Sequence, residues 1–156
     1  MKFILIKFFF AFFIIAPCGL FAQSYYYKQY SLEQGLAQSQ VYVMKQDQFG
    51  FLWLGTIGGI SRFDGTKFYS LTTKEGLVNN AVTSFIEDSR GNMVLGTWKG
   101  LSVYTCEGAW GISTPIENAC KRVFINITKK NGLADEKINA VIEEKEGVYW
   151  LGTDAG

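Results

Sequence analysis

Apolar and polar residues alternate along this chain in short runs that turn residues interrupt. Residues 40–47 (QVYVMKQD) alternate large apolar and polar side chains, which is typical of a β-strand. Residues 51–56 (FLWLGT) are mainly apolar, as expected of a strand that is covered on both faces. The runs at 59–63 (GISRF) and 67–72 (KFYSLT) predict a third and a fourth strand, and the Asp64-Gly65 dipeptide between them is a hairpin signal.

The same order of runs returns further along the chain. The heptapeptide GFLWLGT at 50–56 recurs as GNMVLGT at 91–97 and as GVYWLGT at 147–153. A Gly-Leu pair precedes each copy by 15 residues, counted between the two glycines (35 to 50, 76 to 91 and 132 to 147). Two markers that move together along the chain indicate a structural repeat. Four short antiparallel strands in a repeat of about 41 residues are typical of a β-propeller blade.

The pattern therefore predicts an all-β fold, a partial β-propeller with two full repeats and the start of a third, at 23–156. We expect blade 1 at 35–73, blade 2 at 76–128 and a truncated blade 3 at 132–156. Residues 25–31 (YYYKQYS) align with the fourth-strand runs, so we expect an orphan strand there that would complete the last blade of a ring. With that blade absent, the chain is expected to be a fragment with an open edge, marginal as a soluble monomer.

Turn chemistry explains many of the repeated residues. An acidic residue opens the turn between the first and second strands and a glycine closes it, at 47–50, 88–91 and 144–147. We expect Gly59 and Gly100 to adopt a turn conformation before the third strand. The repeated residues to which we assign structural roles are Gly35, Leu36, Asp47, Gly50, Trp53, Gly55, Gly76, Leu77, Asp88, Gly91, Gly96, Gly132, Leu133, Gly147, Trp150 and Gly152.

Two of these repeated positions predict close packing. Gly55 and its equivalents Gly96 and Gly152 end a strand, where we expect backbones to crowd or bend. Val94 takes the place of Trp53 and Trp150, so we expect bulk to matter there more than an indole N–H. Packing between blades is the interpretation that follows, and a ligand-stacking tryptophan is the alternative.

The second repeat is longer than the first by 15 residues (56 against 41). The extra residues form an insertion at 106–120, which contains Cys106 and Cys120. A disulfide between them would staple the added loop of an exported protein, and two unpaired thiols are the alternative. Loops that break a regular scaffold often carry function, so Trp110 is the candidate ligand-binding residue. A hydrophobic plug for its own loop is the other interpretation of this side chain.

The first 22 residues differ in kind from the rest. Two lysines accompany an apolar run at 8–16, and small and polar residues follow, which is the organisation of a secretory signal peptide at 1–22. Cleavage is expected after Ala22. An uncleaved membrane anchor is the alternative, although the run is short for a bilayer span of about 20 residues. A lipid anchor at Cys18 is disfavoured because Pro17 stands where a small residue is expected.

Composition removes several classes of function. The formal net charge is +1, so no basic field favours a nucleic-acid partner. The chain contains no histidine, the commonest general base and zinc ligand, and no Gly-Lys-Ser/Thr of a phosphate-binding loop. We expect no metal, no cofactor and no catalytic residue. The candidate acids all lie at turns, which disfavours the carboxylate pair of a glycosidase: Asp47, Asp64, Asp88 and Glu144.

The repeated motif resembles the two-component regulator propeller repeat. The first copy carries it in Gly35, Leu36, Val41, Asp47, Gly50, Trp53, Leu54, Gly55, Thr56, Gly58, Gly59, Ile60, Arg62, Phe63, Asp64 and Gly65. The second copy carries it in Gly76, Leu77, Val82, Asp88, Gly91, Leu95, Gly96, Thr97, Gly100, Leu101 and Tyr104, and the third in Gly132, Leu133, Ile138, Gly147, Trp150, Leu151, Gly152 and Thr153. The chain departs from the family where Ala37, Val78 and Ala134 replace the proline after Gly-Leu, and where Glu144 replaces the aspartate.

The resemblance implies an extracytoplasmic, ligand-sensing propeller at the N-terminus of a hybrid two-component sensor of Bacteroidetes type. It implies a periplasmic location, a polysaccharide-derived ligand, and a parent protein with further blades, an immunoglobulin-like domain, an inner-membrane span and kinase modules. A homodimer of the full-length protein is a further expectation. A stand-alone exported propeller that binds proteins or glycans as a scaffold is the alternative, and no enzyme activity is expected in this chain.

Overall fold

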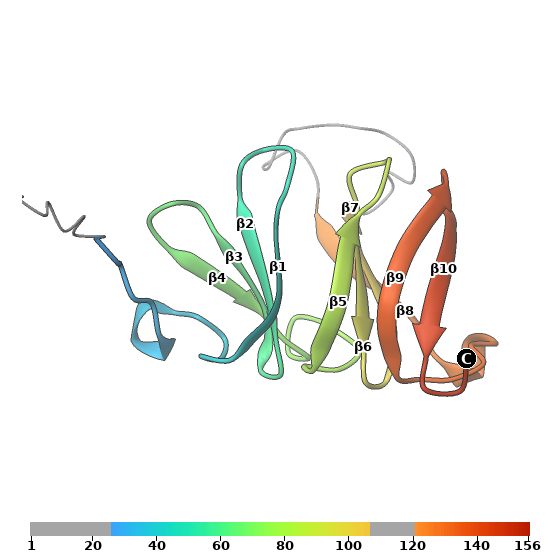
Figure 1. The fold of residues 1–156 in the computed structure, drawn as a ribbon. Helices are drawn as coiled ribbons and strands as arrows, with labels where there is room; N and C mark the ends of the chain where they lie inside the picture. The colour runs from blue at the N-terminus through green and yellow to red at the C-terminus, as the bar shows by residue number, and fades with distance from the viewer. Residues whose placement is uncertain (1–25, 107–120) are drawn as a thin grey trace, which may run out of the picture.

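The computed structural model describes residues 26–106 and 121–156, and these form three antiparallel sheets that stand side by side (Figure 1). Blade 1 contains β1 (Val41–Gln46), β2 (Leu52–Thr56), β3 (Gly59–Phe63) and β4 (Phe68–Leu71). Blade 2 contains β5 (Val82–Glu87), β6 (Met93–Thr97), β7 (Gly100–Cys106) and β8 (Arg122–Ile127). Blade 3 contains β9 (Ile138–Lys145) and β10 (Val148–Thr153), and the short 3₁₀-helices η1 (Leu32–Gln34) and η2 (Lys129–Asn131) precede β1 and β9.

The strands of each full blade pair in chain order, β1-β2-β3-β4 and β5-β6-β7-β8. This order confirms the predicted all-β fold of four-stranded antiparallel blades. The alternation of apolar and polar residues supplies the reason, because successive side chains of a strand point to opposite faces and both faces of a central blade are covered. All five residues of β6 are buried accordingly.

Two apolar cores join the blades. The first lies between blades 1 and 2 and includes Trp53 and Ile60 on one side and Val82, Phe85 and Leu95 on the other. A second core lies between blades 2 and 3, and its buried members are Val94, Leu101, Val103, Ile138 and Val141. Each buried aliphatic side chain contributes about 1.5–3 kcal/mol relative to exposure, so neighbouring blades stabilise one another.

Two of the three glycines that were expected to lie where the chain is crowded, Gly55 and Gly96, do so, whereas a Cβ on Gly152 would have Ala140 as its nearest neighbour, at 3.4 Å. A Cβ placed on Gly55 would lie 2.6 Å from Val43 Cγ1 and 3.0 Å from Val82 Cγ1 of the next blade. A Cβ on Gly96 would lie 2.7 Å from Ile138 Cγ2, again in the next blade. Any larger residue at these two positions would therefore push the blades apart.

Each first strand carries a bulge at the same place in the repeat. Pairing skips one residue between Val41 and Val43 and one between Val82 and Ser84, which leaves Tyr42 and Thr83 outside the ladder. The single hydroxyl proton of Thr83 is shared between the carbonyl of Gly96, at 3.1 Å, and that of Ile138 in blade 3. A bulge thus directs a side chain into the next blade.

The Gly-Leu pairs end capped turns and begin the blades. In η1 the side chain of Gln34 accepts the backbone N–H of Ser31 at 2.7 Å, and Gly35 then takes a left-handed conformation with φ of 98°. Leu36 follows and is buried. Thr128, Asn131 and Gly132 repeat this arrangement around η2. The same cap, glycine and buried leucine are thus repeated within the chain, which explains why the Gly-Leu marker recurs.

Residues 26–31 pair with none of the described strands. The expectation that 25–31 would complete a last blade stays a prediction, because no such blade is among the described ones. Tyr30 packs against Phe63 and Phe68 of blade 1, with ring centroids 5.0 and 5.3 Å away. The predicted signal peptide at 1–22 lies outside the described residues, and the described part of the chain contains no helix that is long and apolar enough to cross a membrane.

Candidate functional site

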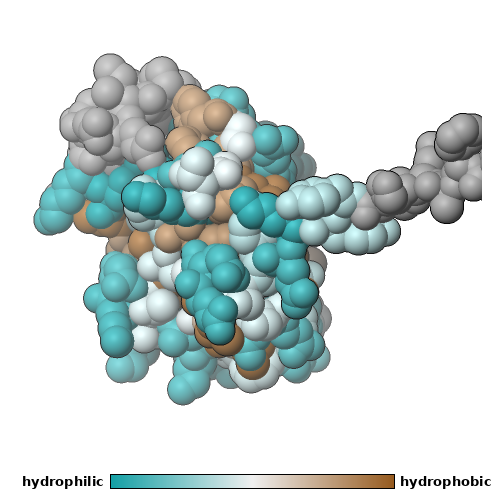
Figure 2. Space-filling view, turned by 90° about the vertical axis from the view of Figure 1, so that its left-hand side faces the viewer, coloured by the Kyte–Doolittle hydropathy of each residue, from teal (hydrophilic) through white to brown (hydrophobic). Residues whose placement is uncertain are grey.

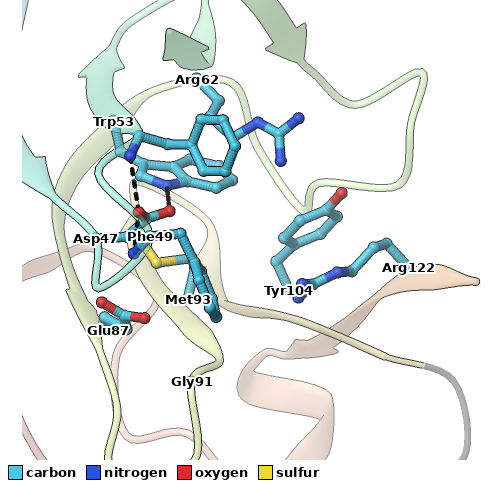
Figure 3. Close-up of a pocket in the computed structure, with 10 residues that line it drawn as sticks. Asp47, Phe49, Trp53, Arg62, Glu87, Gly91, Met93, Tyr104 and Arg122 are labelled. Carbon is cyan, nitrogen blue, oxygen red and sulfur yellow. Dashed lines mark hydrogen bonds between the residues drawn. The ribbon is translucent and has the colours of Figure 1, made fainter. Parts of the chain in front are cut away.

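A pocket of about 270 Å³ lies between blades 1 and 2, at the end where the β1–β2 and β5–β6 turns meet (Figure 3). Blade 1 supplies aromatic walls and one arginine, and blade 2 supplies a second arginine and a tyrosine. The residues that line it are Asp47, Phe49, Phe51, Trp53, Arg62, Glu87, Gly91, Met93, Tyr104 and Arg122. The site depends on the packing of two repeats, since neither blade forms it alone.

Asp47 organises the blade 1 side of the pocket. One carboxylate oxygen accepts the backbone N–H groups of Phe49 at 3.0 Å and Phe51 at 2.9 Å. The other oxygen accepts the indole N–H of Trp53 at 2.8 Å (Figure 3). The indole N–H of Trp53 therefore makes a specific hydrogen bond. The sequence had led us to expect that only the size of this side chain matters, because Val94 takes its place in the second repeat. The hydrogen bond fixes both the turn and the tryptophan ring that lines the pocket.

Two arginines approach the pocket from different blades (Figure 3). The guanidinium carbon of Arg62 lies 4.5 Å from the ring centroid of Phe51 and 5.4 Å from that of Tyr69. The guanidinium carbon of Arg122 lies 5.6 Å from the ring centroid of Tyr104. Such cation–π contacts hold a guanidinium over an aromatic face. The arrangement combines flat apolar walls with hydrogen-bond donors.

The junction between blades 2 and 3 is built differently at the same place. Tyr149 stands where the first junction has Met93, and its hydroxyl donates to Asp88 at 2.7 Å. Asp88 is buried and is the equivalent of Asp47. Partial burial, then the hydrogen bond to Asp88, raise the pKa of Tyr149 well above its ordinary value. At the second junction, Asp88 of blade 2 therefore binds Tyr149 of blade 3.

The two junctions share one polar contact. Glu87 in β5 accepts the backbone N–H of Gln48, in the turn of the preceding blade, at 3.0 Å. Its equivalent Glu143 accepts the N–H of Ser89 at 2.7 Å and the Ser89 hydroxyl at 2.9 Å. Loss of solvent around Glu143 acts to raise its pKa, but the N–H groups of Gly147 and Ser89 outweigh it, so the pKa lies below its usual value.

Of the residues that the sequence singled out, Asp47, Trp53 and Gly91 line this pocket, whereas the predicted ligand-binding and disulfide residues do not. Trp110 and Cys120 lie in 107–120, and Cys106 ends β7, so the disulfide stays a prediction. Trp150 is 62% exposed on the outer side of blade 3. Within 26–106 and 121–156, no group of three histidine, cysteine, aspartate or glutamate residues could hold a metal ion.

Sequence reasoning missed Phe49 and Arg122 and assigned Arg62 only to the repeat motif. The available signal was a break in the repeat, because Val103 occupies the position of Arg62 in blade 2 and is buried in the second core. The juxtaposition of Arg62 and Arg122 could not be read from the chain, since an insertion separates Arg122 from the regular repeat.

Comparison with known proteins agrees with this architecture. Residues 35–58 and 76–99 match the family model of the two component regulator propeller. These two segments are similar to the two component regulator propeller repeat. Both matched segments run from a Gly-Leu pair through the second strand of a blade, so they contain the turns and glycines described above.

A solved structure with the same fold is the extracellular domain of a protein described as a hybrid two component system of B. thetaiotaomicron. The two align with a TM-score of 0.62 and 23% sequence identity over 83% of this chain. The chain spans 17% of the length of that structure. No curated protein matches the chain in sequence.

Proposed function

We propose that this chain forms part of the extracytoplasmic, ligand-sensing region of a hybrid two-component sensor and contributes to signal transduction. The observation that carries the proposal is the match of two successive blades to the two component regulator propeller. The likeness in fold to an extracellular domain of a hybrid two component system supports it. Further blades, a membrane span in the inner membrane and kinase modules would then belong to the parent protein, and this chain would lie in the periplasm.

The pocket between blades 1 and 2 is the proposed ligand site. Aromatic faces suit stacking against a sugar ring, and guanidinium N–H groups suit its oxygen atoms. A polysaccharide fragment is therefore the proposed class of ligand, bound without catalysis, metal or cofactor. Because the two blades share the pocket, a bound ligand would change the free energy of their packing and so alter the shape of the propeller.

Titration of the purified chain with oligosaccharide fragments tests this site by calorimetry. Arg122→Ala should weaken binding at least tenfold, because it removes donors at the mouth of the pocket while Arg122 carries no structural core role. Arg90→Ala is the matched control, since Arg90 lies at the other junction and pairs with Glu146 at 2.9 Å. An affinity that is unchanged in Arg122→Ala but lost in Trp110→Ala would place the ligand on the inserted loop instead.

The proposal that the chain belongs to a sensor is tested by the coding sequence downstream of this chain and by the location of the protein in the cell. A membrane span and a kinase module downstream in the same coding sequence would support it. An exported protein that carries no such modules would instead support the alternative, a stand-alone propeller scaffold. Mass spectrometry of the exported protein would show whether its N-terminus lies at Gln23.

A further inference from the structure

The charged side chains of the pocket between blades 1 and 2 are separated by sign. Asp47 and Glu87 hold their carboxylates on one side of it, and the guanidinium groups of Arg62 and Arg122 lie on the other (Figure 3). Two acids and two bases leave the pocket without the net charge that would attract an ion from a distance. The surface on the blade 1 side also intermixes hydrophilic and apolar residues (Figure 2). Any recognition of charge in this pocket must therefore come from local contacts.

The carboxylate side of the pocket can accept a hydroxyl group. Both carboxylate oxygens of Asp47 already accept N–H groups of blade 1. Glu87 accepts the backbone N–H of Gln48 through Oε2 at 3.0 Å, and no other residue in the described part of the chain donates to Oε1. A sugar hydroxyl can donate to this oxygen, whereas an anion beside it would be repelled.

The opposite side of the pocket carries a cation that no described carboxylate neutralises. The guanidinium carbon of Arg122 lies 5.6 Å from the ring centroid of Tyr104, and Arg122 takes part in none of the ion pairs within 26–106 and 121–156. By contrast, Arg90 at the second junction pairs with Glu146 at 2.9 Å. A cation–π contact leaves the positive charge in place, and a planar guanidinium can bind a carboxylate or a sulfate through two N–H groups.

The arginine at position 122 is a departure from the repeat. Phe124 in β8 and Phe68 in β4 occupy the same register position. Arg122 precedes Phe124 by two residues, so its equivalent in blade 1 is Thr66. Thr66 stabilises its own turn, because its hydroxyl donates to Asp64 at 2.6 Å. The blade architecture therefore does not require an arginine here, and its place in the pocket points to a ligand.

We propose that this pocket binds a saccharide that carries an acidic group, a carboxylate or a sulfate ester, with the acidic group at Arg122 and a hydroxyl at Glu87. The inference rests on the proposed function of the pocket and adds the class of saccharide. A free anion lacks the hydroxyl that Glu87 accepts, and a neutral sugar leaves Arg122 without a counter-charge. Phe49, which is 46% exposed in the β1–β2 turn, offers an apolar face to the sugar ring.

Calorimetry of the purified chain with matched pairs of oligosaccharides tests this class. The pairs are a galacturonan tetramer and an alginate tetramer, each with its carboxyl-reduced form, and a sulfated galactan tetramer with its desulfated form. In at least one pair the acidic form should bind about tenfold more tightly or better than the neutral form, because it gains a charge-assisted contact. The pair that shows the preference distinguishes a carboxylate from a sulfate ester.

Variants at position 122 connect the preference to the arginine. In Arg122→Gln the ratio of the two affinities should fall toward one, because glutamine keeps an N–H donor and lacks the charge. Arg122→Lys should retain part of the ratio, since lysine keeps the charge without the planar fork. Lys130→Gln is the matched control: it removes the same charge from the exposed end of η2, so the ratio should not change. Circular dichroism checks that each variant folds.

The outcomes separate this inference from the proposed function. Equal affinities for the acidic and neutral forms of every pair that binds would overturn the inference and leave the saccharide site in place. An acidic preference that is unchanged in Arg122→Gln would also overturn it, because the acidic group would then bind elsewhere. Binding of none of these oligosaccharides would reject the pocket as a saccharide site and the inference with it.

Discussion

At the residue scale, Asp47 illustrates how one carboxylate joins a turn to a core. It accepts two backbone N–H groups and the indole N–H of Trp53, which is buried. Asp47→Ala should lower the free energy of unfolding by about 2 kcal/mol, because it removes the acceptor of three N–H groups, two of which are part-buried. Urea unfolding followed by circular dichroism measures this loss.

The contribution of the Trp53 indole N–H to the free energy of unfolding can be measured by a double-mutant cycle. Trp53→Phe removes the N–H and keeps an aromatic ring, so Asp47→Ala in that background should cost about 1 kcal/mol less than in the natural chain. Equal costs in the two backgrounds would show that the hydrogen bond to Trp53 contributes nothing to stability.

Tyr149 predicts a dependence on alkaline pH. Its pKa in the folded chain lies above the ordinary value of about 10, first because of burial and then because of the bond to Asp88. Above pH 10 the unfolded chain loses a proton that the folded chain keeps, so stability falls as the pH rises. The urea midpoint should fall more steeply above pH 10 in the natural chain than in Tyr149→Phe, and parallel profiles would contradict this assignment.

At the element scale, the glycine that ends the second strand of each blade sets the distance to the next blade. Gly96→Ala should cost about 1–3 kcal/mol, because its Cβ would lie 2.5 Å from Ser84 Oγ of the same blade and 2.7 Å from Ile138 Cγ2 of the next. Gly152→Ala is the matched control and should change stability by less than about 0.5 kcal/mol, since its nearest neighbour lies at 3.4 Å. Thermal unfolding of the two variants measures both changes.

At the scale of the whole molecule, stability should be graded from the centre outward. Blade 2 has a neighbour on both faces, and all of β6 is buried, whereas β10 has exposed residues along its length. Repeat architectures derive much of their stability from such neighbour contacts. Hydrogen exchange followed by mass spectrometry should find the slowest amides in β6 and β7 and faster exchange in β10. Slower exchange in β10 than in β6 would contradict this gradient.

The sequence by itself determined the repeat and therefore the blade. Alternating runs, the Gly-Leu pairs and the acid-to-glycine turns depend on local backbone preferences, which act within a few residues of one another. These local rules predicted the strands from β1 to β10 and the crowded glycines Gly55 and Gly96. The orphan strand expected at 25–31 stays a prediction, because the blade that it would complete is not among the described blades.

Only the tertiary structure decided which repeated residues face one another across a junction. Trp53 and Trp150 occupy the same place in the repeat, yet one is buried and the other is exposed, because a blade follows the first and none of the described blades covers the second. Arg62 and Arg122 meet at one pocket because two blades pack together there. Local sequence specifies the strands of a blade, whereas the neighbouring blades decide which residues of each face are buried and which line a pocket.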